Sequence, residues 1–252
     1  MRQELEELKA RVEPPIPPSR LRGGIGPGDF WTEGWLSLDR LLEFTQSAEL
    51  RHVLDVGSGL GRFALPLSTV LPENARYDGF DVAAAYVDWC KDGLGLDDRF
   101  RFRHAAVRNS QYNPEGKSSS RWFRFPFPKE TFSHTVACSL YTHLTAPETK
   151  RYLRESARVL APGGLFFGTF FLVDDGSRAL LESGDTYPVF RYSVRHGYLV
   201  DRDSPGDGVA FHRVWVERQL ARARLDLVSI VPGAWRTHAQ GYYQDTVVAR
   251  KA

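Results

Sequence analysis

Cysteine is scarce in this sequence, and long apolar runs are missing. The 252 residues include two cysteines, Cys90 and Cys138, which lie in apolar contexts and form no motif. We therefore expect neither a disulfide framework nor a thiolate metal site, and we expect a reducing compartment. No apolar run approaches membrane-spanning length, and the charged N-terminus lacks the apolar core of a secretory signal. These absences predict a cytoplasmic protein without membrane partners.

Neither sign of charge is in large excess. Lys and Arg number 33 against 31 Asp and Glu, a net charge of +2. Nucleic acid is not the expected partner, because dedicated nucleic-acid binders carry a strongly basic surface; a local basic patch stays open. The hydrophobic fraction of 42% is ordinary for a globular protein, and a chain of this length can bury a full core.

The most informative stretch is Val53–Arg62. A short apolar run contains Asp55 near its end, and glycines then alternate at Gly57, Gly59 and Gly61. This pattern predicts a buried strand, a tight turn that lets a ligand approach the backbone, and the start of a helix. Such a turn binds an adenosine-containing cofactor at the carboxyl end of a parallel strand.

Three kinds of nucleotide site place glycines after a first strand. A phosphate-binding P-loop needs a lysine after the glycines, and none follows here. A dinucleotide site needs a third glycine where this chain has Arg62, and Asp55 would repel a pyrophosphate while it tolerates a cationic amino-acid tail. Asp81, which closes the next strand, can accept hydrogen bonds from both ribose hydroxyls of either cofactor. The combination favours S-adenosylmethionine over a nicotinamide cofactor.

Strand and helix patterns alternate from residue 51 onward. Strands are expected at 53–56, 77–80, 100–104, 135–139, 165–172, 225–231 and 246–249. A capping box at Thr145 opens a helix that ends at Pro162–Gly164. The prediction is an α/β fold with a doubly wound, mostly parallel seven-stranded, Rossmann-like sheet and helices on both faces.

The pattern also predicts the domain organisation. Residues 1–28 form an N-terminal arm with a short helix and a Pro/Gly-rich linker, and 29–252 form one domain. The arm is either loose, a cap on the active site, or a contact in a homodimer. Insertions at about 109–131 and 173–211 interrupt the domain and, with the turn at 233–235, are expected to bind the substrate.

Four segments resemble the class I S-adenosylmethionine-dependent methyltransferases, in particular the broad small-molecule group. They are VLDVGSGLGR (53–62), YDGFDV (77–82), ACSLYTHL (137–144) and RVLAPGGLFFGTF (158–170). The resemblance extends from about residue 50 to 172. It implies S-adenosylmethionine as methyl donor, S-adenosylhomocysteine as product, and no metal.

The resemblance also implies a cofactor site. In it, Asp55 and Gly57 face the methionine part, Asp81 binds the ribose, and Val82 packs on the adenine. The exit of the third strand has no acid for the adenine amine, which leaves backbone carbonyls or Asn109 to bind it. The full expected set is Asp55, Gly57, Ser58, Gly59, Gly61, Asp81, Val82, Ala106, Val107, Ser139, Leu140, Phe30 and Trp31.

His143 and Tyr141 are the candidate catalytic residues. His143 follows the fourth strand and can act as the base that deprotonates a hydroxyl; the alternative is a cap or a loop contact. Tyr141 can donate to the acceptor or contact the sulfonium, or it is a packed aromatic residue. His196 and His212, with nearby aspartates, have no ligand spacing and are interpreted as parts of solvated loops.

The expected reaction is methylation of a hydroxyl, or less readily an amine, of a small-molecule or sugar-like acceptor. One loop is rich in arginine and aromatic residues, which would suit an anionic acceptor, unless its rings only anchor the loop. These residues are Arg121, Trp122, Phe123, Arg124, Phe125 and Phe127. The alternatives are a catalytically silent adenosine-ligand-binding protein, an RNA methyltransferase and a nicotinamide oxidoreductase.

Overall fold

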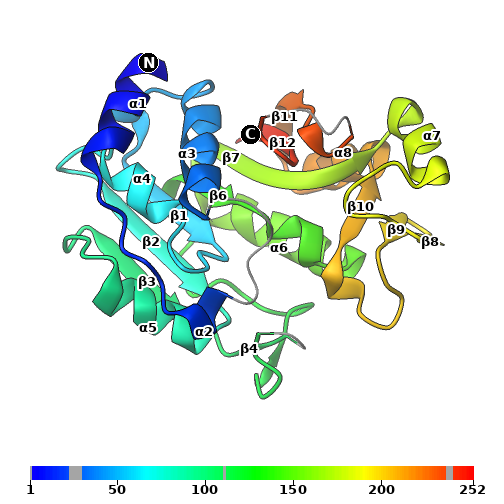
Figure 1. Ribbon diagram of the computed structural model, residues 1–252, viewed down its shortest axis with the longest axis horizontal. Coiled ribbons are helices and arrows are strands. Elements are labelled where there is room, and N and C mark those ends of the chain that lie inside the picture. Colours follow the sequence, from blue (N-terminus) through cyan, green and yellow to red (C-terminus); the bar gives the residue numbers. More distant parts are fainter. Residues whose placement is uncertain (1, 23–29, 110–111, 237–240) are drawn as a thin grey trace.

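The computed structural model describes residues 2–22, 30–109, 112–236 and 241–252, and it places helices on both faces of one main sheet (Figure 1). The helices are α1 (Arg2–Arg11), α2 (Ser19–Arg22), α3 (Phe30–Leu42), α4 (Ala64–Ser68), α5 (Ala84–Gly93), α6 (Ala146–Val159), α7 (Asp175–Ser183) and α8 (Arg213–Arg222). Short 3-10 helices are η1 (Ser47–Glu49), η2 (Tyr141–His143), η3 (Pro205–Asp207) and η4 (Ala234–Arg236). The strands are β1 (His52–Val56), β2 (Arg76–Asp81), β3 (Phe100–His104), β4 (Val107–Arg108), β5 (Ser118–Ser119), β6 (Phe132–Ala137), β7 (Leu160–Val173), β8 (Tyr192–Val194), β9 (Gly197–Leu199), β10 (Val209–His212), β11 (Leu225–Val231) and β12 (Asp245–Lys251).

The sheet has the strand order that creates a ligand crevice. Strands β3, β2, β1, β6 and β7 lie side by side and are parallel. The chain runs outward from β1 through β2 to β3, then returns to β6 on the other side of β1. This switch point between β1 and β6 is where open α/β sheets bind ligands, at the carboxyl ends of the strands. The predicted fold class is confirmed.

Strand β7 has two different neighbours along one edge. Its residues Leu165–Phe170 pair with β12 in the antiparallel sense, and Phe171–Val173 pair with β10 in the parallel sense. Strand β10 then continues through β9 to β8. The segment 173–211, interpreted from the sequence as an insertion, therefore contributes α7 and three strands that widen the sheet.

The start of β7 differs from the prediction. The strand begins at Leu160, and α6 ends at Val159, so the proline and glycines at 162–164 lie within the strand rather than at the end of the helix. The pairing with β6 jumps from Phe132–Leu160 to His134–Leu165. The proline thus sits in an irregular part of the ladder, where its missing N–H costs no interstrand bond.

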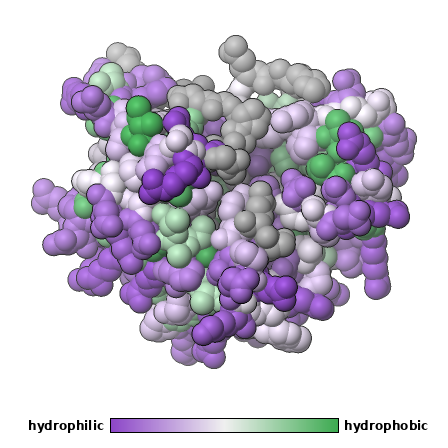
Figure 2. Space-filling view, turned by 60° about the horizontal axis from the view of Figure 1, so that its bottom comes forward, coloured by the Kyte–Doolittle hydropathy of each residue, from purple (hydrophilic) through white to green (hydrophobic). Residues whose placement is uncertain are grey.

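Alternate residues of the central strands pack into two separate cores. Val53 and Phe167 belong to the cluster beneath α3, α4 and α5, whereas their neighbours Leu54 and Phe166 belong to the cluster beneath α6 and α8. Because side chains of a strand point to opposite faces in turn, this alternation requires helices on both sides. Outside the cores, the face shown in Figure 2 carries mainly hydrophilic side chains with small hydrophobic patches.

The N-terminal arm packs on its own chain. Helix α1 contacts α3, and Leu5 is 7% exposed in the same cluster as Leu38. The predicted Gly23–Gly28 turn lies outside the described residues. Contact of the arm with a partner subunit stays a prediction.

The aromatic connection before β6 is an anchor. Phe125 and Phe127 are buried with ring centroids 4.9 and 6.3 Å from Phe80. Arg158 donates to the carbonyls of both phenylalanines at 3.0 Å. The rings of Phe125 and Phe127 therefore point inward, whereas the side chains of Arg121, Trp122 and Arg124 are exposed. Arg121 and Arg124 do not line the pocket described below, and the buried rings match the alternative interpretation, in which they anchor the loop.

Candidate active site

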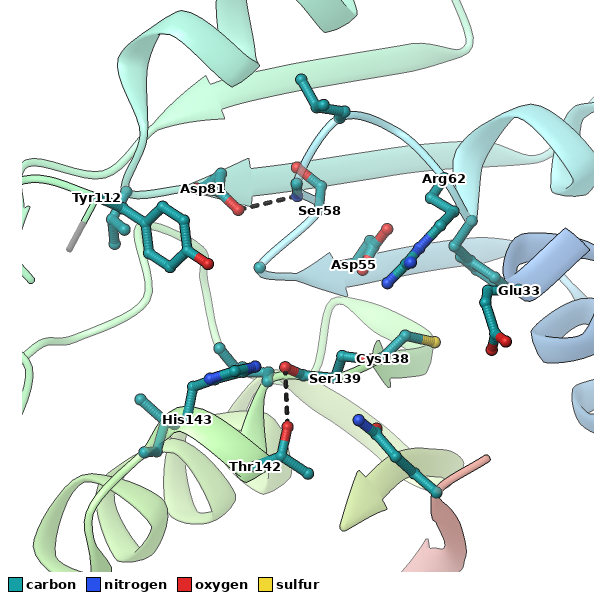
Figure 3. Close-up of a pocket in the computed structure, with 18 of the residues that line it drawn as sticks. Glu33, Asp55, Ser58, Arg62, Asp81, Tyr112, Cys138, Ser139, Thr142 and His143 are labelled. Carbon is teal, nitrogen blue, oxygen red and sulfur yellow. Dashed lines mark hydrogen bonds between the residues drawn. The ribbon is translucent and has the colours of Figure 1, made fainter. Parts of the chain in front are cut away.

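A cavity of about 540 Å³ opens at the carboxyl ends of β1, β2 and β6 (Figure 3). This volume suits a small-molecule ligand. Asp81, Tyr112 and His143 surround one end of the cavity, and Glu33 and Arg62 lie at the other (Figure 3). The motif residues predicted from the sequence therefore converge on one pocket with residues from α3.

The glycine turn after β1 combines two functions. Gly57, Gly59 and Gly61 have φ of 77°, 54° and 78°, which is left-handed backbone that favours glycine. A Cβ on Gly61 would lie 2.2 Å from Leu94 Cδ1, so that glycine lets the turn pack on the end of α5. A Cβ on Gly59 would meet nothing within 4 Å, and Gly59 lines the cavity. The middle glycine keeps the pocket wall open to a ligand.

Asp81 is held by the same turn. Its Oδ2 accepts from the Gly59 N–H at 2.8 Å, and its Oδ1 accepts from the Ala83 N–H at 2.8 Å. Burial raises the pKa of Asp81, and these backbone hydrogen bonds oppose the rise. Each oxygen keeps a further lone pair, so the carboxylate can still accept hydrogen bonds from a ligand.

Asp55 lines the cavity, and its pKa is unusually high for an aspartate. The side chain is 2% exposed, and the Tyr77 hydroxyl donates to its Oδ2 at 2.7 Å. Burial raises the pKa of Asp55 to about 7; the charge of Asp81 adds to the rise, and Tyr77 and Arg62 oppose it. The carboxyl group is therefore ready to ionise when a cation enters the pocket.

The exit of β6 is a tight turn at Ser139. This residue has φ of 54°, which costs a non-glycine residue on the order of 1–2 kcal/mol. Its N–H donates to Thr169 Oγ1 at 2.7 Å, and its carbonyl accepts from Thr142 Oγ1 at 3.2 Å (Figure 3). The turn is held from both sides, and Ser139 and Leu140 line the cavity.

His143 has a defined tautomer. Its Nδ1 lies 2.7 Å from the carbonyl oxygen of Gly206 in η3. A carbonyl can only accept, so Nδ1 carries the hydrogen and Nε2 carries the lone pair. His143 lines the cavity, so the geometry leaves an acceptor nitrogen for a proton.

Four predicted site residues do not line the cavity. Tyr141 is fully buried and stacks on Phe170 with centroids 4.5 Å apart. Trp31, in α3, is buried in the same cluster as Leu38, Ala106 is exposed, and Gly61 faces α5. In each case neighbouring residues line the pocket instead. Phe30, Ser58, Val82 and Val107 do line it, as does Asn109.

Other lining residues have no motif in the sequence. They come from α3, from the loop after β4, from the segments flanking β8 to β10 and from the C-terminal segment; Glu33, Arg108, Tyr112, Tyr187, Asp207, Tyr242, Tyr243 and Gln244 are among them. Only the aromatic composition of 241–245 could have signalled a site there. Arg62, whose place in the sequence argues against a dinucleotide site, has its guanidinium in the cavity, 5.7 Å from the ring centroid of Phe30.

No group of three or more His, Cys, Asp or Glu side chains in the described ranges is arranged to hold a metal ion. None of the helices that the structure describes combines the length and apolar character needed to cross a membrane.

Residues 53–164 match a family model described as a methyltransferase domain. A malonyl-[acyl-carrier protein] O-methyltransferase from Geobacter sulfurreducens is 30% identical over 162 residues, which are 64% of this chain and 52% of that protein. This chain thus spans about half the length of the curated relative.

Two solved structures share the fold. A SAM-dependent methyltransferase from Methanosarcina mazei has a TM-score of 0.56 at 16% identity and covers 84% of this chain and 96% of its own. The complex between the Haloferax volcanii Trm112 methyltransferase activator and the putative methyltransferase contains a chain with a TM-score of 0.59 at 14% identity, which covers 92% of both chains. The family match spans β1 to the start of β7, which is the part that builds the glycine turn and both acids. Residues 53–164 thus form a methyltransferase domain, and the chain around them has the fold of the S-adenosylmethionine-dependent methyltransferase from Methanosarcina mazei.

The cofactor of this methyltransferase domain is S-adenosylmethionine, and the residues present fit it. Asp81 offers a fixed carboxylate of the kind that binds a ribose diol. Ser58 Oγ is buried at the cavity and has no hydrogen-bond partner among the described residues. Asp55 provides a carboxylate for a cationic group, and Gly59 leaves open space beside it.

Proposed function

We propose that this protein transfers the methyl group of S-adenosylmethionine to a hydroxyl group of a small molecule, with His143 as the general base. The observation that carries the proposal is the hydrogen bond from His143 Nδ1 to the Gly206 carbonyl, which leaves Nε2 to accept a proton. The bound cofactor supplies an activated methyl group on a positively charged sulfur. The domain then has to align the acceptor, exclude water and remove one proton.

The cofactor residues have separate roles in this proposal. Asp81 accepts hydrogen bonds from the ribose hydroxyls, and Val82 and Val107 flank the adenine. Asp55 stabilises the cationic methionine part. Arg62 is the cation at the far end of the cavity and attracts the carboxylate. When bound, S-adenosylmethionine would supply its methyl group to the acceptor oxygen and keep the electron pair of the broken bond on sulfur, while His143 Nε2 would take the hydroxyl proton.

A carboxyl acceptor is the second candidate. The relative from Geobacter sulfurreducens is a malonyl-[acyl-carrier protein] O-methyltransferase. A carboxylate needs no base, so His143 would be dispensable if this chain methylated one. Amine acceptors and a homodimer formed through α1 also stay open as proposals.

The test is titration calorimetry with S-adenosylmethionine, S-adenosylhomocysteine and NADH, followed by an assay of S-adenosylhomocysteine release over hydroxyl, amine and carboxyl acceptors. We expect binding of the first two ligands and turnover with hydroxyl acceptors. Binding without turnover of any acceptor would favour a silent ligand-binding protein. Binding of NADH alone would contradict the proposal.

A further inference from the structure

One wall of the cavity is aromatic and lies outside the family match. Phe171 at the end of β7, Tyr187 before β8 and Tyr243 before β12 line the cavity, and all three follow residue 164. The cofactor half of the pocket comes from residues 53–143 and α3, as described above. The aromatic wall therefore belongs to the half that is left for the acceptor.

The wall is preformed by a small core of its own. Phe171 packs edge-to-face against Phe190 and Trp235, with centroids 5.3 Å apart in both pairs. The ring of Tyr243 lies 5.8 Å from that of Phe171, and its hydroxyl donates to the carbonyl of Tyr187. Rings fixed in this way present flat apolar surface without further ordering, which favours stacking with a planar ligand.

The charges around the cavity are mainly negative. The carboxylates that line it belong to Glu33, Asp55, Asp81, Glu148 and Asp207, against the guanidinium groups of Arg62 and Arg108. Glu148 accepts from the Thr145 N–H at 2.7 Å as part of a helix cap. No described residue donates a hydrogen bond to the Asp207 carboxylate or forms an ion pair with it.

Asp207 also lies beside the candidate base. It directly follows Gly206, whose carbonyl holds His143 at 2.7 Å, and both Asp207 and His143 line the cavity. An acceptor that reaches His143 therefore lies in the same cavity as a carboxylate that no described residue pairs with. This arrangement attracts a hydrogen-bond donor or a cation and repels an anion.

Resting on the methyl transfer proposed above, we propose that the acceptor is an uncharged or cationic aromatic alcohol. Its ring packs against Phe171, Tyr187 and Tyr243, and Asp207 selects against acceptors that bear a carboxylate or phosphate. The acceptor specificity of this domain thus resides in segments that the family match does not include.

Ligand-observed NMR with matched phenols tests this proposal. The probes are tyramine, 4-methylphenol and 4-hydroxybenzoate, with cyclohexanol as the non-aromatic alcohol, each measured with and without S-adenosylhomocysteine. We expect tyramine and 4-methylphenol to bind about tenfold more tightly than 4-hydroxybenzoate and cyclohexanol. Asp207→Asn should reduce the ratio of the affinities for tyramine and 4-hydroxybenzoate by about fivefold. Tyr187→Ala should reduce the affinity for both neutral and cationic phenols by about tenfold.

Two controls match these variants. Asp203 is an exposed carboxylate in the same loop as Asp207, and the ring of Tyr192 lies under Arg202 outside the cavity, so Asp203→Asn and Tyr192→Ala should change nothing. The proposal is overturned if 4-hydroxybenzoate binds the parent as tightly as tyramine, or if each variant behaves like its control. If the parent protein shows the phenol preference but does not bind S-adenosylhomocysteine, only the methyltransferase proposal is overturned.

Discussion

Asp55 shows how the fold changes the chemistry of a residue that the sequence can already locate. Its position after a buried run predicts a carboxylate at the cofactor, but the sequence gives no indication of its acidity. Its raised pKa arises from burial and from the charge of Asp81, against the hydrogen bond from the Tyr77 hydroxyl. His143 is similar, because the carbonyl that fixes its tautomer belongs to Gly206, 63 residues further along the chain.

The affinity for S-adenosylmethionine should depend on pH through Asp55. Its pKa of about 7 in the ligand-free protein lies well above the ordinary value, so the carboxyl group is largely protonated below pH 7. A cationic ligand favours the ionised form. Affinity should therefore rise by up to about tenfold per pH unit between pH 5.5 and 7 and level off above pH 8. Calorimetric titrations across this pH range measure the affinity, and Asp55→Asn should remove most of its dependence on pH.

Replacing Asp81 should weaken binding of the cofactor and leave the stability of the fold unchanged. Asp81→Asn keeps one acceptor oxygen for the backbone and loses the charge that strengthens hydrogen bonds to a ribose. We expect affinity for S-adenosylhomocysteine to fall about ten- to a hundredfold. Asp88→Asn, on the exposed side of α5, is the matched control. Equal affinities for the two variants would contradict the role of Asp81.

At the scale of elements, β7 joins the two halves of the pocket. Its first part pairs with β12 and its last residues with β10, so it holds the C-terminal segment and the segment around β8 to β10 together. Asp245 at the start of β12 is fully buried and accepts from the Leu172 N–H at 2.7 Å and Trp235 Nε1 at 2.9 Å. Arg236 donates to both Asp174 at 2.9 Å and Asp245 at 3.1 Å.

Breaking this network should destabilise the domain. Asp245→Ala leaves the N–H groups of Leu172 and Gly233 and the indole N–H of Trp235 without an acceptor. It also removes one of the two carboxylates that Arg236 binds, and together these losses should lower the free energy of unfolding by about 3–5 kcal/mol. Urea titrations followed by circular dichroism measure the change. Asp226→Ala, on the exposed part of β11, should stay within about 0.5 kcal/mol of the parent. Similar losses for both variants would show that the network contributes little.

At the scale of the molecule, the features that the sequence predicts are those encoded by residues close together in the chain. The glycine turn, Asp81 and the central strands follow from residues close together in the chain, and the structure confirms the fold they imply. The β8–β10 extension was missed because its strands are short and carry no regular alternation. Of the two interpretations of Tyr141, the packed aromatic residue is the one observed, because its ring lies in the core against Phe170.

The N-terminal arm should affect stability and not cofactor binding. Leu5 is buried against α3, away from the residues that line the cavity. Leu5→Ala should lower the free energy of unfolding by about 2–3 kcal/mol, while the affinity for S-adenosylmethionine stays the same. Guanidinium titration and calorimetry measure the two quantities. A drop in affinity without a drop in stability would indicate that the arm caps the site.

The central claim is that His143 removes the acceptor proton, and chemical rescue of His143→Ala tests it most directly. We expect kcat for methyl transfer to a hydroxyl acceptor to fall about 10²–10⁴-fold with unchanged affinity for S-adenosylmethionine, and added imidazole to restore part of the rate. His212→Asn, which introduces a residue favoured at the N-cap of α8, should retain full activity. Full turnover by His143→Ala, or a loss that imidazole cannot restore, would contradict the account.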